Sequence, residues 1–292
     1  MVMVGVELET DVEEVEECAE CTVVDGCYVI PEVSGKRACE THGSQYRCLQ
    51  DLRSLGRYVP RSVVKLPNKL TEVRTPLRVT VWRRALESHP DREFVQFMLT
   101  GVQEGFRIGY DRCRTHQSAT RNMKSANENS AVVEQYLHTE MEKGRVVGPL
   151  NLGSVPGVQI SPFGVIPKSR PGEWGLIVDL SSPEGHSVND GIDKSICSLQ
   201  YVTINTIVEK IQQCGSGALL GKLDIKSAYR IIPVHPDDRL LLGMKWKGQL
   251  FIDTALPFSL RSAPKIFNAV ACRCTTVDHA AKRNKIDRSL LG

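Results

Sequence analysis

The stretch Ala218–Arg230, ALLGKLDIKSAYR, constrains the fold of this chain more than any other. An apolar run of strand length follows a glycine-rich turn, a pattern that predicts a buried β-strand. The strand delivers Asp224 at its carboxyl end, and the small-aromatic pair Ala228-Tyr229 follows. A carboxylate in that place suits a hard cation such as Mg²⁺, although an aspartate that only caps a turn would leave the same pattern.

Charge is distributed unevenly along the 292 residues. Residues 1–50 hold 11 acidic and 3 basic side chains, and residues 51–292 hold 23 acidic and 34 basic ones, so the net charges are −8 and +11. The basic body suits a polyanionic partner, and it equally suits an ordinary solvated surface. Because the sequence has neither a span-length apolar stretch nor a secretory signal, we expect no membrane insertion and an intracellular location, in cytoplasm or nucleus. The oligomeric state stays open.

The acidic leader also carries five of the ten cysteines. Cys18 and Cys21 form one closely spaced pair, and Cys39 and His42 form another. Two such pairs can hold one tetrahedral Zn²⁺, which would make the leader a zinc-binding interaction module. The alternative is a set of free thiols in a poorly ordered leader.

Helical and strand periodicities alternate through the rest of the chain and predict an α+β fold. Apolar residues at helical spacing predict helices within Thr75–Arg112, and residues 118–130 are interpreted as a polar linker. A further helix is expected from a cap at Ser130 to Gly144. Another is expected after Thr203, with Ile204, Ile207, Val208 and Ile211 on one face.

Two β-hairpins are also expected. The runs Phe163–Lys168 and Trp174–Leu180 flank Arg170-Pro171-Gly172, which is a typical turn sequence. A second hairpin is expected to turn at Lys247-Gly248. The later stretch LPFSLRSAPKIFN, residues 256–268, is interpreted as a loop that approaches a ligand closely before Pro264 leads into a helix.

Three segments in order carry a resemblance to a known family: SPFGVIPKS with GEWGLIVDLSSPEGHSVND, then LDIKSAYR, then LPFSLRSAPKIF. They resemble the fingers and palm of a retrotransposon reverse transcriptase, an RNA-directed DNA polymerase and nucleotidyltransferase, most closely of the DIRS-like tyrosine-recombinase type. The resemblance implies a partial right-hand polymerase. Its parts are an acidic Cys-rich leader with a basic irregular segment over 1–74, a helical lead-in and linker over 75–130, fingers over 131–215, a partial palm over 216–271 and an aberrant tail over 272–292.

The resemblance also implies roles for the matching residues. Asp224 would hold the two catalytic Mg²⁺ ions of the intact family, and Tyr229 would be the steric gate that selects deoxynucleotides. The implied partners are an RNA or DNA template-primer and dNTPs. The residues implied to bind the incoming nucleotide are Lys168, Ile225, Lys226, Ser227, Tyr229, Phe258 and Ser259. Those implied to contact the template are Arg261, Ser262, Ala263 and Pro264.

The sequence departs from the family where activity is concerned. Gly175 stands where an arginine normally clamps the triphosphate, and Ser259 stands where a glycine is usual. No Tyr-x-Asp-Asp turn follows Pro264, and no thumb or ribonuclease H domain follows either. We therefore expect a chain truncated before that turn and inactive as written, with a non-catalytic nucleic-acid-binding remnant as the alternative.

The tail over residues 272–292 has no apolar period, although a palm helix and strand should follow. Permitted codons for this tail, read one nucleotide later, can spell an amphipathic helix followed by His-Tyr-Leu-Asp. A frameshift in a decaying, pseudogene-like copy is therefore one hypothesis. A gene-model error and an alternative exon are the others.

Overall fold

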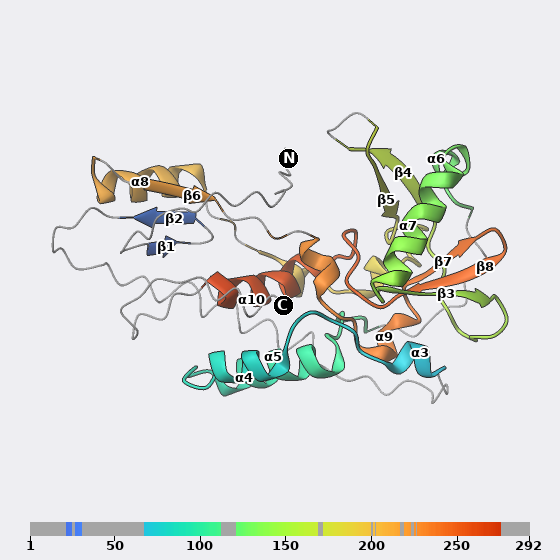
Figure 1. Cartoon of the computed structure of the whole chain (residues 1–292), viewed down its shortest axis with the longest axis horizontal. Coiled ribbons are helices and arrows are strands. Elements are labelled where there is room, and N and C mark those ends of the chain that lie inside the picture. Colours follow the sequence, from blue (N-terminus) through green and yellow to red (C-terminus); the bar gives the residue numbers. More distant parts are fainter. Residues whose placement is uncertain are drawn as a thin grey trace.

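The computed structural model describes residues 22–24, 27–30, 67–111, 121–168, 172–199, 201, 203–216, 219–222, 225 and 227–275. Helices and strands alternate along these residues, which confirms the α+β class (Figure 1). Several predicted residues lie outside the described part: Cys18, Cys21, Cys39, His42, Arg170, Pro171, Asp224 and Lys226. No helix among the described residues is both long and apolar enough to cross a membrane.

The lead-in is helical, as predicted. Its helices are α4 (Val79–Ala85) and α5 (Arg92–Glu104), and a short helix α3 (Asn68–Thr71) precedes it, within the segment that was expected to be irregular. The Asp91 side chain caps α5 by accepting a hydrogen bond from the Phe94 amide at 3.0 Å. One face of α5 is buried through Phe94, Met98, Gly101 and Val102, so the predicted helical spacing is confirmed.

A three-stranded antiparallel sheet has the order β3–β8–β7. Its strands are β3 (Val146–Asn151), β7 (Gly243–Trp246) and β8 (Gln249–Asp253). The predicted turn between β7 and β8 is confirmed, because Lys247 and Gly248 have φ values of 46° and 79°. Helix α7 (Ser130–Glu142) packs against β3. Ser130 is its first helical residue and not its cap, because Asn129 precedes the helix in that position.

A separate two-stranded hairpin pairs β4 (Phe163–Pro167) with β5 (Trp174–Val178), as predicted. The expected polar linker before α7 is wrong in part, since α6 (Lys124–Glu128) lies there and contacts β4. The amide of Val165 donates to the Ser125 hydroxyl at 3.1 Å, and that of Phe163 donates to the Asn122 side chain at 3.2 Å. The side chains of these polar residues accept hydrogen bonds from strand amides. Because they are polar for that reason, the segment has the composition of a linker.

A third sheet has the order β1–β2–β6, formed by β1 (Thr22–Val24), β2 (Cys27–Ile30) and β6 (Leu219–Lys222). Helix α8 (Ile204–Cys214) contacts β2 and lies along this sheet (Figure 1). The Thr203 hydroxyl caps α8 by accepting from the Thr206 amide at 3.2 Å. Of the predicted apolar face, Ile204 and Val208 are 78% and 44% exposed, whereas Ile207 and Ile211 are half-buried.

Short elements connect the sheets to the last described helix, α10 (Ala263–Thr275). They are η1 (Asn189–Gly191), η2 (Ser195–Cys197), η3 (Ala228–Ile231) and α9 (Pro236–Arg239). One hydrophobic core includes side chains from the lead-in, α7, the β4–β5 hairpin, the β7–β8 hairpin and α10. This shared core places η3, which contains Tyr229, beside the start of α10.

Candidate nucleotide-binding site

Asn189 joins the first and third of the motif segments. Its side-chain amide donates to the hydroxyl of Ser181 and to the carbonyl of Ser259, each at 2.9 Å. Its side-chain oxygen accepts from the amide of Arg261 at 2.8 Å. Asn189 is only 5% exposed, so these bonds are shielded from water and fix the loop over residues 258–264 against the end of the first segment. The sequence pattern alone assigned Asn189 no role, although it lies within the first motif.

The Arg261 side chain strengthens the same junction. One of its guanidinium nitrogens donates to the carbonyls of Asn189 and Ile192, the latter at 2.9 Å. The next two residues, Ser262 and Ala263, have no exposed surface. In this arrangement these residues hold the loop in place, and their contact with a template stays a prediction.

Tyr229 joins the second motif segment to the third. Its ring lies 5.1 Å from the ring of Phe258 and 5.3 Å from that of Phe267, with the second pair edge to face. Phe258 is 60% exposed, whereas Tyr229 is half-buried. Burial, with a smaller contribution from Tyr201, raises the pKa of the Tyr229 phenol, so the hydroxyl is protonated at neutral pH. The cluster therefore presents an exposed aromatic face beside a protonated hydroxyl.

The backbone has an unusual conformation at Ser227, the residue before η3. Ser227 lies in the left-handed region with φ 54° and ψ 36°, and its carbonyl accepts from the Arg230 amide at 2.7 Å. A non-glycine residue there is uncommon and costs about 1–3 kcal/mol, a strain that clusters at functional sites. Ile225 is half-buried against the main core, and Asp224 and Lys226 lie outside the described residues.

A buried ion cluster holds η3 from behind. Arg230 is 4% exposed and donates to Glu140 at 3.0 Å, to Asp253 at 2.6 Å and to the carbonyl of Ala255 at 3.3 Å. Burial acts to lower the pKa of Arg230, but the nearby acidic groups, Asp253 foremost, raise it above its ordinary value. The charged guanidinium thus ties α7, η3 and β8 together next to Tyr229. The sequence does carry a signal for this cluster, because Arg230 stands within the apolar run AYRIIPV and a charged side chain buried there needs an acidic partner.

Lys168 lies at the end of the β4–β5 hairpin, exposed to solvent as expected. Its amide donates to the carbonyl of Glu173 at 2.9 Å, which closes the base of the turn. Gly175 pairs with Ile166, and a Cβ built on it would lie 3.8 Å from the nearest atoms, which belong to Ile166 and Lys168. The position where the family has an arginine therefore has room for a side chain. Trp174 beside it is 41% exposed.

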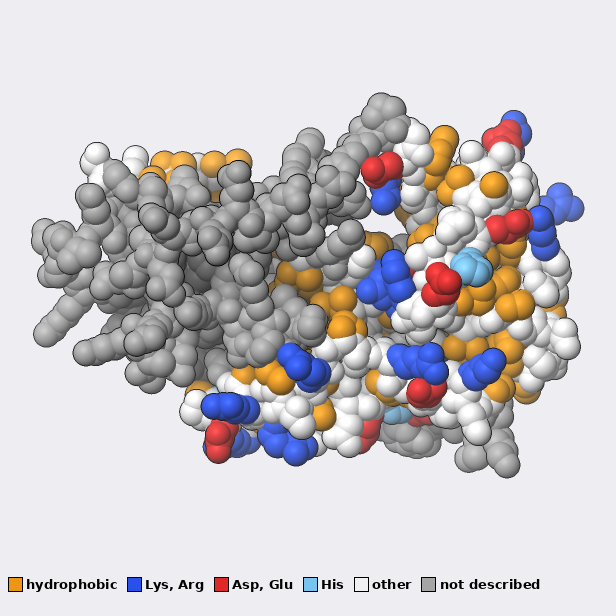
Figure 2. All heavy atoms as spheres, viewed as in Figure 1, with side chains coloured by type: hydrophobic (Ala, Val, Ile, Leu, Met, Phe, Trp, Pro, Cys, Tyr) orange, Lys and Arg blue, Asp and Glu red, His pale blue; other side chains and the backbone are white. Residues whose placement is uncertain are grey.

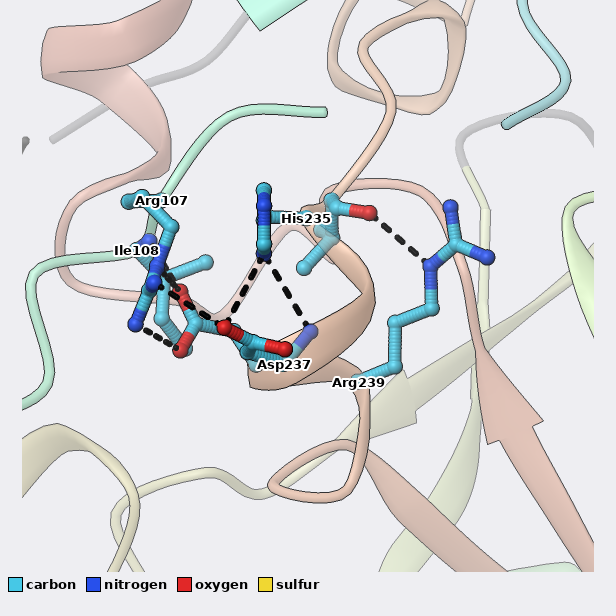
Figure 3. A network of polar contacts seen from close by, with 7 residues as sticks. Arg107, Ile108, His235, Asp237 and Arg239 are labelled. Carbon is cyan, nitrogen blue, oxygen red and sulfur yellow. Dashed lines mark hydrogen bonds and ion pairs between the residues drawn. The ribbon is translucent and has the colours of Figure 1, made fainter. Parts of the chain in front are cut away.

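A polar network behind the site connects the lead-in to α9 (Figure 3). Arg107 makes two hydrogen bonds to Asp238, of 2.8 and 3.1 Å, and the same carboxylate accepts from the Ile108 amide at 3.0 Å. His235 begins α9 by accepting from the Asp237 amide at 3.2 Å. Burial, followed by the charge of Arg107, lowers the pKa of His235. This network holds the chain that leads from η3 into β7.

The described carboxylates do not fit a two-metal centre. No three His, Cys, Asp or Glu side chains in the described part of the chain gather where they could share a metal ion. Asp253 is committed to Arg230, and Asp224 lies outside the described residues. Two-metal catalysis needs carboxylates that clamp both ions, so we derive no chemical step through a metal here.

No protein-family model matches the sequence, and no curated protein matches it. Among similar solved structures, the native prototype foamy virus protease-reverse transcriptase is 16% identical, with a TM-score of 0.38, over 68% of this chain and 27% of its own. A foamy viral protease-reverse transcriptase in complex with double-stranded DNA is 13% identical, with a TM-score of 0.36, over 73% and 37%. One in complex with an RNA/DNA hybrid is 14% identical, with a TM-score of 0.36, over 73% and 28%. The chain thus spans less than half the length of these proteins, and TM-scores this low lend no weight to a function.

Proposed function

We propose that residues 75–271 are the fingers and part of the palm of a reverse transcriptase of the DIRS-like retrotransposon type. The carrying observation is that three motif segments, far apart in sequence, meet through Asn189 and the Tyr229–Phe258 ring contact. Asn189 and Ser259 are 70 residues apart, so local sequence does not force this contact. The choice of family rests on the resemblance of the three motif sequences to those of reverse transcriptases.

In this proposal the aromatic cluster forms the floor of a nucleotide site. Exposed Phe258 offers a face on which a base stacks, and Tyr229 walls the sugar where a ribose 2′-hydroxyl would lie. Asp224 would be a Mg²⁺ ligand in the intact family. The partners are a template-primer of RNA or DNA and dNTPs.

We further propose that these 292 residues do not catalyse DNA synthesis. They contain one motif aspartate, no Tyr-x-Asp-Asp turn and a glycine at the clamp position, Gly175. Loss of a preorganised charge in the transition state alone costs about 10²–10³ in rate. The remaining activity is nucleic-acid binding by residues 51–292, whose net charge is +11. Figure 2 shows Lys and Arg side chains interspersed with acidic ones, which favours a weak, sequence-independent contact.

The test compares two readouts on the purified full chain. Primer extension with Mg²⁺ or Mn²⁺ should give no incorporation, whereas fluorescence anisotropy should show template-primer binding that weakens between about 50 and 200 mM salt, about 10-fold or more. Phe258→Ala should weaken binding to single-stranded DNA about 5-fold to 150-fold, because stacking contributes about 1–3 kcal/mol per base. Leu152→Ala, a change at another exposed apolar residue, should have no effect. Equal loss in both variants would refute the aromatic floor, and extension that Asp224→Ala abolishes would refute the inactivity.

A zinc-binding leader remains the second candidate. Its four ligands, Cys18, Cys21, Cys39 and His42, lie outside the described residues, so it still depends on their spacing alone. Metal analysis of the full chain should find one Zn²⁺ that is lost in Cys18→Ser and retained in Cys48→Ser. Zinc-free protein purified from zinc-supplemented medium would exclude this function.

A further inference from the structure

The strand that leads to Asp224 takes its partner from the leader. In β6, Leu219 pairs with Ile30, Leu220 with Val29, Gly221 with Tyr28 and Lys222 with Cys27. The second leader strand, β2, pairs in turn with β1, through Val24 and Cys27 at the closed end and Thr22 and Val29 at the open end. The two sides of the β2–β6 ladder are 189 residues apart in sequence, from Ile30 to Leu219.

This pairing stabilises both β6 and the leader hairpin. A single four-residue strand has no ladder of its own, and an isolated two-stranded hairpin is marginally stable in water. Three strands with a helix against one of them reach the size at which a small sheet holds together. Helix α8 contacts β2 and lies along the three strands in Figure 1, so the leader hairpin, β6 and α8 form one unit.

We propose that the edge of β6 is a strand-acceptor surface and that the leader hairpin, formed by β1 and β2, is its intramolecular strand donor. The hairpin completes the sheet immediately before Asp224 and closes an edge that would otherwise present unpaired backbone groups to other chains. This role does not depend on polymerase activity, nor on zinc binding. Without the donor, a second copy of the chain or an extended peptide could add to the same edge.

The register supplies a direct test, because the chain already carries a cysteine at the right place. Cys27 lies opposite Lys222, and directly opposed residues in an antiparallel pair have Cβ atoms about 4.5–5.5 Å apart, close enough to be bridged after a small shift. Lys222→Cys should therefore form a disulfide with Cys27 under mild oxidation, identified by peptide mapping. Gly221→Cys is the matched control, since neighbouring residues on a strand project to opposite faces, and it should not link to Cys27.

A second experiment tests the donor role in the full chain. Val29→Pro removes an amide from the middle of β2 and disrupts the ladder, whereas Val29→Thr keeps the amide and the β-propensity. Hydrogen exchange at β6, residues 219–222, should accelerate at least about 10-fold in the proline variant and stay unchanged in the threonine variant. A synthetic peptide of residues 20–32, added to the proline variant, should restore the protection.

Two results would overturn the proposal. One is that the cysteine introduced by Lys222→Cys forms no disulfide with Cys27 under mild oxidation with copper phenanthroline. The other is β6 protection that is the same in Val29→Pro as in the unmodified protein. If the proline variant does not fold, the disulfide in the Lys222→Cys chain still decides the pairing. None of these readouts uses nucleotide or template, so their failure leaves the proposed function untouched.

Discussion

Single residues decide how the candidate site is held. Asn189 is the clearest case, because its side chain is only 5% exposed and makes three hydrogen bonds, to Ser181, Ser259 and Arg261. Removing it strands the Ser259 carbonyl and the Arg261 amide, and each buried group left without a partner costs about 1–3 kcal/mol.

Asn189→Ala should accordingly lower the free energy of unfolding by about 2–4 kcal/mol in urea denaturation. Asn151→Ala, at an exposed asparagine on β3, is the control and should stay within about 0.5 kcal/mol. If the two variants are equally stable, Asn189 does not fix the loop over residues 258–264.

Two glycines test the space around Gly175, the position where the reverse transcriptases that the sequence resembles carry an arginine. Gly175 has ordinary room for a Cβ, whereas a Cβ on Gly191 would lie 2.0 Å from the Tyr110 ring. We expect Gly175→Ala to be neutral or to stabilise slightly, and Gly191→Ala to cost about 1–3 kcal/mol, because overpacking displaces a buried ring. Thermal denaturation of the two variants measures this difference. A destabilised Gly175→Ala would mean that the hairpin cannot accept the arginine that the family carries.

At the scale of elements, a buried ion cluster links α7, η3 and β8. Arg230 bridges α7 and β8 from η3, with partners 90 and 23 residues away. Arg230→Ala should destabilise the protein by about 3–5 kcal/mol, since it removes the counterion of the buried Asp253 carboxylate. Glu140 also loses this partner but keeps its ion pairs with Lys143 and Arg145.

Arg74→Ala provides the matched comparison, because Arg74 pairs with Glu72 at an exposed site. That change should leave the unfolding midpoint unmoved. Similar midpoints for the two variants would show that the Arg230 cluster adds nothing to the contacts around it.

The same contrast explains which elements the sequence could predict. The hairpin turn at Lys247-Gly248 and the helix α5 depend on residues that are close in sequence, so pattern and turn chemistry predicted both. The helix α6 was missed because Asn122 and Ser125 form their bonds with strands about 40 or more residues away. The roles of Asn189 and Arg230 were missed for the same reason. The resemblance, in contrast, implied that Tyr229 and Phe258 bind the same nucleotide; the structure shows their rings in contact, and the nucleotide role stays a prediction.

At the scale of the whole molecule, we expect the polar network of Figure 3 to make the free energy of unfolding depend on pH. His235 has a lowered pKa in the folded protein, caused first by burial and then by Arg107, while Asp237, Asp238 and Glu104 act against the shift. A base whose folded pKa is lowered favours the folded state when neutral. Its contribution is therefore present above the unfolded pKa of about 6.5 and is lost as pH falls through that value toward the folded pKa.

We expect the melting temperature to fall as pH decreases from about 7 toward 5, and His235→Gln to flatten that dependence. His138→Gln is the control, since that histidine is on the exposed side of α7. An unchanged pH profile in His235→Gln would assign the acid sensitivity to other groups.

The pairing of β2 with β6 has a consequence for folding during synthesis, because β2 is made long before the strand with which it pairs. Residues 27–30 leave the exit tunnel long before their partners at 219–222 are made, and at about 5–20 residues per second the wait is roughly 10–40 s. During that interval the leader hairpin has no acceptor in its own chain, while strand contacts this distant are slow to form even when both halves exist. The leader of a nascent chain is thus exposed to neighbouring copies on the same polysome. Expression with few ribosomes per messenger RNA, or with the leader provided as a separate peptide, should raise the yield of protein in which β2 and β6 are paired.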